Sequence, residues 1–215
     1  MKTQTKLSNK ILLSLLLCLF SVSMPAQKID QLFIDMPDKY IPTLSKQQRF
    51  ELLEYSKINR KDSTKNRFGS NTAIEVFDTI NQLITINTTA TSRIEIKIIN
   101  KKTIGLIQTV NQPIALSKIL MFDLNWQLLP QQPVFPAAEL WLDNAKLRQD
   151  NLQPEELLKI TKTNFLSCTF IRSGDDIEVY NNTPYYLSIE DNKKFSPYLY
   201  KKRTLSLQNN QWVIQ

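Results

Sequence analysis

The segment 93–98 alternates charged residues with isoleucine without interruption. Successive side chains of a β-strand point to opposite faces of its sheet, so this alternation predicts an antiparallel strand with one face in a core and one in water. The core residues are Ile94, Ile96 and Ile98, and the residues expected to face water are Arg93, Glu95 and Lys97. Any fold of this chain must therefore cover one face of a sheet.

Other segments also have a strand-like composition, and fewer resemble helices. Strands are expected at 82–88, 103–110, 116–123, 165–172, 177–180, 204–207 and 211–214. Helices are expected at 46–58, 137–142 and 154–160, and a polar loop at 59–72. Because short turns join consecutive strands, we predict an α+β fold with one or two antiparallel meander sheets and helices on one face.

The predicted helix 46–58 has both a start signal and an apolar stripe. Ser45 and Gln48 have the spacing of a capping box, in which each side chain bonds the backbone of the other residue. Phe50 and Leu53 lie on the apolar stripe. We expect both to enter the core that the isoleucines of 93–98 complete.

Composition divides the chain into four parts. These are a predicted signal peptide at 1–26, an apolar strap with one helical turn at 27–42, and two α-then-β units at 43–130 and 131–215. Each unit ends alike, with a strand, an Asn-containing turn and a segment that begins at Trp126 or Trp212. Two tandem units that share one core are one interpretation, and chance similarity is the other.

The first 26 residues have the parts of a secretory signal. Three lysines precede the twelve-residue apolar run Ile11–Val22, and small residues follow it. A membrane-spanning helix needs roughly 20 apolar residues, which favours cleavage, after Ala26 or Ser23, over an uncleaved anchor. The mature chain is then exported without a transmembrane span, and loss of the three lysines lowers its formal charge from +7 to +4.

The residue inventory excludes several chemistries. Histidine is absent, and Cys168 is the one thiol left after removal of the signal. Zinc, iron or copper sites of His and Cys, and His- or Cys-dependent catalysis, are therefore not expected. Cys168 lies in a strand-like run and is expected to be buried. Phosphate-binding loops need closely spaced glycines, whereas the three glycines of this chain are far apart. From the absence of such loops and of His and Cys ligand sets, we expect no metal and no cofactor.

Paired carboxylates are the remaining route to catalysis, because glycoside hydrolysis needs two acids and no histidine. The candidate pairs are Asp175 with Asp176, Glu139 with Asp143, and Asp35 with Asp38. The first pair is explained by a hairpin turn, and the second by the solvent-exposed surface of a short helix. The third pair is explained by helix capping. No pair stands out as catalytic, and a glycan hydrolase is the alternative to a non-enzymatic protein.

Two sets of residues are candidates for a binding surface. Lys57, Arg60 and Lys61 form a basic cluster suited to an anionic glycan or lipid headgroup, and Tyr185 and Tyr186 are adjacent aromatic residues. An exported chain of charge +4 is not expected to bind nucleic acid. We therefore expect a non-enzymatic envelope or secreted binding module for a protein or glycan, with a purely structural envelope component as a further alternative.

Two longer segments carry a resemblance to a known family. Leu32–Pro42 contains Met-Pro-Asp, and 122–130 reads Phe-Asp-Leu-Asn-Trp-Gln-Leu-Leu-Pro. With the signal, the helix and the isoleucine strand, they resemble domain-of-unknown-function family 3256, small secreted proteins of Gram-negative anaerobic bacteria. The resemblance covers most of the mature chain. It implies an α+β domain exported to the periplasm or beyond, and no site residue carries over because the family has no assigned activity.

Overall fold

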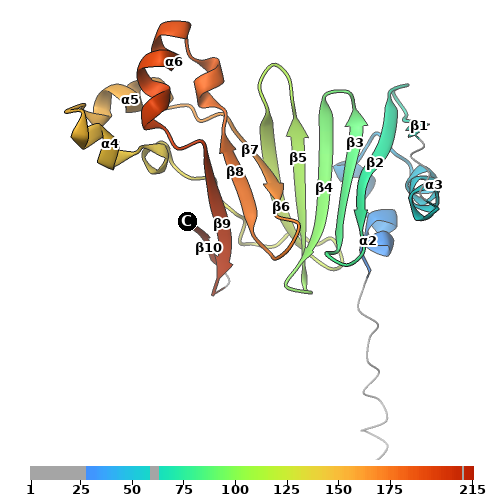
Figure 1. The fold of residues 1–215 in the computed structure, drawn as a ribbon. Helices are drawn as coiled ribbons and strands as arrows, with labels where there is room; N and C mark the ends of the chain where they lie inside the picture. The colour runs from blue at the N-terminus through green and yellow to red at the C-terminus, as the bar shows by residue number, and fades with distance from the viewer. Residues whose placement is uncertain (1–27, 59–62, 210) are drawn as a thin grey trace, which may run out of the picture.

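A computed structural model of the chain describes residues 28–58, 63–209 and 211–215. The predicted signal peptide, 1–26, lies outside these described residues. The fold is α+β, as predicted, with one antiparallel sheet of six strands and another of four (Figure 1). The chain therefore has two sheets whose faces must be covered.

The larger sheet is a meander in which every strand pairs with the next along the chain. Its strands are β1 (Ser63–Lys65), β2 (Asn71–Asp78), β3 (Leu83–Thr89), β4 (Ser92–Ile99), β5 (Thr103–Val110) and β6 (Leu116–Asp123). β5 and β6 have the predicted bounds. The prediction of a continuous loop at 59–72 is wrong, because β1 and the start of β2 pair within it.

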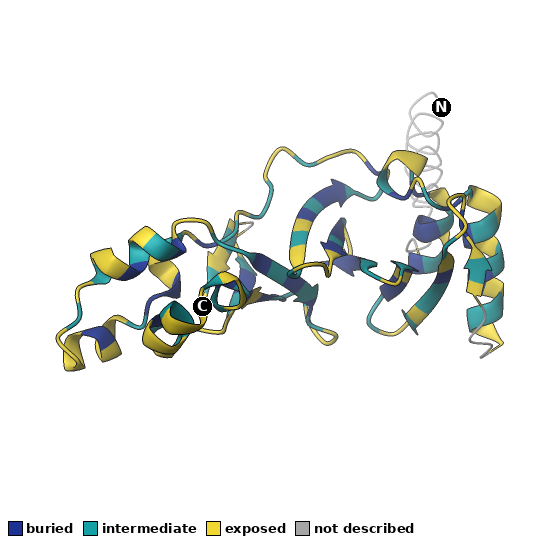
Figure 2. Ribbon diagram, turned by 90° about the horizontal axis from the view of Figure 1, so that it is seen from above, coloured by how far each residue is buried: buried dark blue, intermediate teal, exposed yellow. Residues whose placement is uncertain are grey.

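The smaller sheet has the order β10-β9-β8-β7. Its strands are β7 (Leu166–Phe170), β8 (Ile177–Asn181), β9 (Lys202–Gln208) and β10 (Gln211–Ile214). The described helices are α2 (Ile29–Asp35), α3 (Lys46–Lys57), α4 (Asn144–Gln149), α5 (Pro154–Thr161) and α6 (Ile189–Phe195). Short 3₁₀ helices are η1 (Asp38–Tyr40), η2 (Ala138–Trp141), η3 (Thr183–Tyr186) and η4 (Ser196–Tyr198). Figures 1 and 2 place α4 to α6 at the opposite end of the molecule from α2 and α3.

The strap and α3 cover one face of the larger sheet. Ile94, Ile96 and Ile98 are buried on this face, as predicted, against Phe33 of α2 and Leu53 of α3. At the rim of this core the Trp126 indole N–H donates to the Leu32 carbonyl at 3.2 Å. The strap and the turn after β6, which are distant in sequence, therefore pack together.

The smaller sheet covers the other face, and this corrects the expectation for β4. Glu95 and Lys97 were expected to face water, yet each is only 2% exposed. The residues beside them pack in a second core, where Ile99 and Ile107 of the larger sheet meet Phe170 of β7. The second face of a strand can contact either water or another sheet. In this chain charged residues alternate with isoleucine although the second face contacts a sheet, so the sequence pattern could not distinguish the two cases.

Helix α3 begins as predicted, but the prediction is wrong for one of the two residues that were expected in the core. The Ser45 and Gln48 side chains form both bonds of the capping box. Leu53 is fully buried, whereas Phe50 is 46% exposed. The buried residues of α3 are Arg49, Leu52 and Leu53. The helix face that contacts the sheet is therefore rotated away from Phe50.

Candidate functional site

An apolar cleft of about 820 Å³ lies where η2 and α5 meet the start of β6 and the start of β7. Its apolar lining is Leu116, Phe135, Pro136, Ala137, Ala138, Leu158 and Leu166. This volume is in the range of ligand-binding pockets, which are mostly apolar with a few polar groups. The cleft is therefore the best candidate for a binding site.

One face of α5 forms a wall of the cleft. The helix begins with a proline. An N–H at the first position of a helix has no partner within the helix, so proline, which lacks this N–H, is well suited to that position. Glu155, Leu158, Lys159 and Lys162 line the cleft at helical spacing, while Leu157 is buried on the opposite side of the helix. The wall is thus an amphipathic stripe with charged groups beside an apolar centre.

Four charged side chains border the cleft: Glu139, Glu155, Lys159 and Lys162. Within the part of the chain that the structure describes, none of them forms an ion pair. Sequence reasoning paired Glu139 with Asp143, but the Asp143 side chain caps α4 by accepting from the Lys146 backbone N–H at 3.1 Å. Glu155 is the other acidic residue that lines the cleft, and it lies too far along the chain for sequence spacing to link it with Glu139.

Tyr185 and Tyr186 lie in η3 and are 77% and 61% exposed. The Tyr186 ring stacks on Phe165 with 4.1 Å between ring centroids. Asn182, the residue before η3, donates from its side-chain amide to the Ala115 carbonyl at 2.8 Å. Ala115 directly precedes the cleft residue Leu116. The two tyrosines therefore project from a segment that is fixed beside the cleft.

The basic cluster does not join this surface. Lys57 ends α3, at the opposite end of the molecule from η3 and α6 (Figure 1). Its ammonium pairs with Glu54 at 2.9 Å and Asp30 at 3.8 Å. Arg60 and Lys61 lie outside the described residues. Of the sequence candidates, Lys57 and the tyrosine pair are therefore not brought together.

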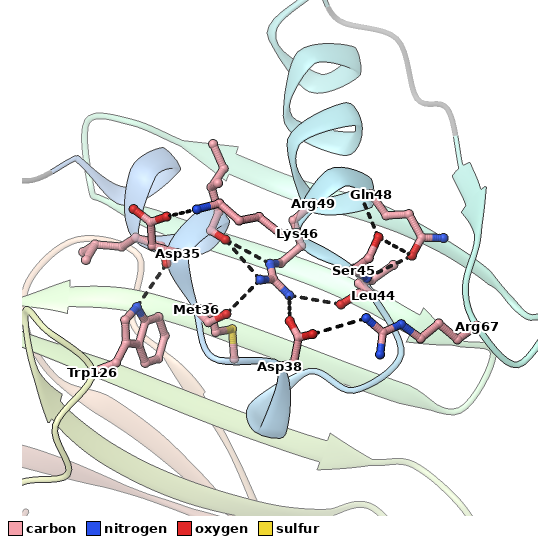
Figure 3. Close-up of polar contacts among 12 residues, drawn as sticks. Asp35, Met36, Asp38, Leu44, Ser45, Lys46, Gln48, Arg49, Arg67 and Trp126 are labelled. Carbon is pink, nitrogen blue, oxygen red and sulfur yellow. Dashed lines mark hydrogen bonds and ion pairs between the residues drawn. The ribbon is translucent and has the colours of Figure 1, made fainter.

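Figure 3 shows a buried arginine that sequence reasoning missed. The Arg49 guanidinium donates to the carbonyls of Ile34, Met36 and Leu44 and to the Asp38 carboxylate, all at 2.8 to 3.2 Å. These bonds fix the strap against α3. The expectation that Asp38 caps a helix is wrong, because η1 has no side-chain cap and Asp38 binds Arg49 instead.

Asp35 was expected to cap a helix with Asp38, and it too has another role. Its carboxylate lies at the end of α2 and pairs with Lys46 at 2.7 Å. Hydrogen bonds from Gln31 and Lys46 hold the pKa of Asp35 below its ordinary value. Asp35 and Asp38 each pair with a cation of α3 and together belong to the attachment of the strap.

Two buried charges hold β7 against β4. The Glu95 carboxylate accepts from the Thr169 hydroxyl at 2.8 Å and from the Phe170 backbone N–H at 3.0 Å, and it forms an ion pair with Arg93 at 3.0 Å. Burial nevertheless raises the pKa of Glu95. The Lys97 ammonium donates to the Arg172 carbonyl at 2.9 Å and also to the Ile171 carbonyl, and burial lowers its pKa. Both groups connect the sheets and lie apart from the cleft.

The remaining chemically reactive groups are structural. Cys168 is buried as predicted, and burial raises the pKa of its thiol to about 12. Asp175 and Asp176 lie in the hairpin between β7 and β8, next to Gly174, whose φ is +98°. Among the described residues, no group of three or more His, Cys, Asp or Glu is placed to hold a metal ion.

Together these features define an α+β protein of two stacked antiparallel sheets with an apolar cleft at one edge of the larger sheet. The model of the family described as "Protein of unknown function (DUF3256)" matches residues 21–212. The chain belongs to this family.

Similarity to other known proteins concerns the fold alone. A solved domain of an uncharacterized protein from Porphyromonas gingivalis W83 has a TM-score of 0.71 at 15% identity, covering 87% of this chain and 97% of that chain. No curated protein matches the sequence. Within the described ranges, no helix has the length and apolar character needed to cross a membrane.

Proposed function

We propose that this chain is an exported, non-enzymatic binding module that receives its ligand in the cleft between η2 and α5. The observation that carries the proposal is the cleft itself, with its apolar lining and four charged groups that have no ion-pair partner in the described chain. Unpaired charges around an apolar centre give a ligand both area to bury and groups that fix its orientation. The exposed Tyr185 and Tyr186 extend the surface beside it.

Photo-crosslinking tests the binding role. The chain carries p-benzoylphenylalanine in place of Lys159 and is irradiated with isolated envelopes of the native host. We expect a discrete adduct that is lost in Ala137→Trp, since Ala137 is an exposed residue of the cleft lining. Ala90→Trp is the matched control, because Ala90 is also exposed but lies in the turn between β3 and β4. No adduct, or an adduct that survives Ala137→Trp, would contradict the proposal.

A glycan hydrolase is the second candidate, because Glu139 and Glu155 both line the cleft. Two carboxylates on either side of a glycosidic bond are the minimum for that reaction. We favour binding because Lys159 and Lys162 share the cleft and balance the two acids. The test is release of reducing ends from cell-wall glycan of the native host. We expect no release above that of the double variant Glu139→Gln/Glu155→Gln, whereas release lost in that variant would establish the hydrolase.

The proposed export has its own measurement. The basic, apolar and small-residue order of 1–26 supports removal of a signal peptide. Intact mass of the protein from its native host is expected to correspond to a chain that starts between residues 24 and 27. A mass that includes Met1 to Val22 would show that the segment is retained.

A further inference from the structure

The charged side chains of the cleft are accessible. Glu155, Lys159 and Lys162 of α5 and Glu139 of η2 are all exposed residues of its lining. Among the residues that the structure describes, none of these side chains forms an ion pair or a hydrogen bond. A bound molecule can therefore reach each charge without displacing a partner from it.

A charged residue of α5 outside the cleft does have a partner. Glu156 is absent from the lining and pairs with Lys194 of α6 at 3.5 Å. Glu155 and Lys159 are four residues apart, in the order that favours an ion pair along a helix, yet they form none in the described chain. The charges in the lining are thus the ones that still lack a counter-ion.

The charges of α5 are separated by sign along the cleft. Glu155 lies in the first turn of the helix, and Lys162 is the residue at its C-terminal end. Seven residues of helix separate them, which is about 10.5 Å along the helix axis. Leu158 lies between them in the lining. This wall of the cleft therefore has a negative end, an apolar centre and a positive end.

A ligand that matches this wall has a cationic and an anionic group about 10 Å apart, with an apolar body between them. A short peptide with free ends has these features, because its α-ammonium group and its carboxylate are the two charges. An extended chain spans at most about 3.3–3.6 Å per residue, so three residues cover about 10 Å. The cleft volume of about 820 Å³ is in the range of sites for small organic ligands.

We propose that the ligand of the cleft is a free peptide of about three residues with apolar side chains. This inference rests on the proposed binding function and names the ligand. The α-ammonium group of the peptide pairs with Glu155, its carboxylate pairs with Lys162, and its side chains pack on Leu158 and Phe135 of the lining. Charged hydrogen bonds at both ends fix the direction in which the peptide lies.

Calorimetric titration with synthetic peptides tests the length of the ligand. Tripeptides built from alanine, valine, leucine and phenylalanine are screened on the purified chain, and the tightest is chosen. Its central residue is then deleted, or alanines are inserted beside it to give a hexapeptide. We expect both changes to weaken binding by about threefold or more, because the ends no longer meet Glu155 and Lys162 together. Affinity that rises steadily with length would show that apolar area alone is recognised.

Capping of the peptide ends gives a second readout. N-acetylation removes the ammonium charge and C-amidation removes the carboxylate charge, and each is expected to weaken binding by about fivefold. Acetylation should have no effect on binding to Glu155→Gln, and amidation none on binding to Lys162→Gln, because each variant has already lost that contact. Acetylation tested on Lys162→Gln, and amidation tested on Glu155→Gln, should keep their effects of about fivefold.

Two variants control for the change in net charge. Glu156→Gln removes an acid from the same helix but outside the cleft, and Lys193→Gln removes a base from α6. Both are expected to leave the affinity of the peptide and the effects of capping unchanged. Ala137→Trp, which places a large side chain in the lining, is expected to abolish binding. Thermal melts that match wild type show that the variants are folded.

Several results would overturn the proposal. Equal binding of the uncapped and the doubly capped peptide would show that chain ends are not recognised. Acetylation without effect on Glu139→Gln, but with its effect kept on Glu155→Gln, would contradict the assignment of the amino end. If no tripeptide binds, a peptide ligand is rejected, while a photo-crosslinked adduct at position 159 that Ala137→Trp removes would still support the binding role. An adduct with the added mass of a whole protein would identify a protein partner instead.

Discussion

Buried charges in this protein are held mainly by backbone groups. Arg49 is 2% exposed, and three of the four groups that it contacts are carbonyls. Lys97 binds two carbonyls, and Glu95 accepts from a backbone N–H as well as from side chains. Carbonyls left without their donor in a buried site cost free energy. Loss of one such side chain is therefore expected to affect stability more than loss of an exposed ion pair.

Arg49→Lys tests this expectation. A lysine cannot reach the three carbonyls and Asp38 together, so we expect about 3 kcal/mol of lost unfolding free energy. Arg67→Lys is the matched control, because Arg67 binds the same Asp38 at 3.2 Å from an exposed position and should change stability by less than about 1 kcal/mol. Urea denaturation measures both variants. Equal effects would show that the carbonyl bonds contribute little.

Asp78 makes stability depend on acid pH. The backbone and side-chain N–H groups of Asn81, and then Arg172, hold the pKa of this carboxyl far below its ordinary value of 3.8. A depressed pKa stabilises the fold above the ordinary value, and this stability is lost as pH falls toward the folded-state pKa. Asp78→Asn is therefore expected to cost about 2 kcal/mol at neutral pH. Urea denaturation at a series of pH values measures the difference in unfolding free energy between Asp78→Asn and wild type. This difference should narrow below about pH 4, and a difference that stays constant with pH would contradict the prediction.

Single residues were predictable where local chemistry decides their place. The Ser45 and Gln48 capping box depends on residues three apart, and burial of Cys168 follows from its apolar run. The cleft could not be predicted this way. Glu155 and Ser117 come together only through packing of elements that are far apart in sequence.

Elements were predicted best where hydrophobic periodicity is unbroken. β5 and β6 have the predicted bounds because each is a continuous β-favouring run. β2 was missed because a register shift between Ile74 and Val76 interrupts its pairing with β3, and with it the alternation of a regular strand. α5 was predicted within a residue of its end, but which of its faces borders a cleft depends on η2 and β6.

Helix α3 offers a matched comparison of its two sides. Leu53 is fully buried and Phe50 is 46% exposed. Leu53→Ala is expected to lower the unfolding free energy by about 2–5 kcal/mol because it leaves a cavity, and Phe50→Ala by less than about 1.5 kcal/mol. Urea denaturation of both variants decides. A larger effect of Phe50→Ala would show that the helix is rotated from its described position.

At the scale of the molecule, the close approach of the two sheets depends on Gly105. A Cβ at this position of β5 would lie 2.6 Å from Cζ of Phe170 on β7 and 2.9 Å from Cδ1 of Ile99. Gly105→Ala is therefore expected to destabilise the protein by about 1–3 kcal/mol through overpacking. Phe170→Leu shortens the opposing side chain, so the double variant should lose less than the sum of the single ones. Additive losses in thermal melts would contradict this contact.

The α+β class followed from the sequence, but the stacking of one sheet on the other did not. Alternation in 93–98 specifies that one face is covered and leaves the second face open to water or to protein. The close contact of the sheets at Gly105 and the burial of Glu95 depend on residues of β7, about 70 positions away. The division into units 43–130 and 131–215 stays a prediction.

The burial of Glu95 and Lys97 has a consequence for chain synthesis. The six strands of the larger sheet are complete at residue 123, whereas the sheet that covers them begins at residue 166. Local hairpins form rapidly, so the meander can assemble on its strap while its second face is still bare. Hydrated charges on that face oppose aggregation during this interval. When β7 arrives, both side chains lose their water. The Glu95 carboxylate then accepts from the Phe170 N–H and the Lys97 ammonium donates to the Arg172 carbonyl, which sets where the late sheet docks.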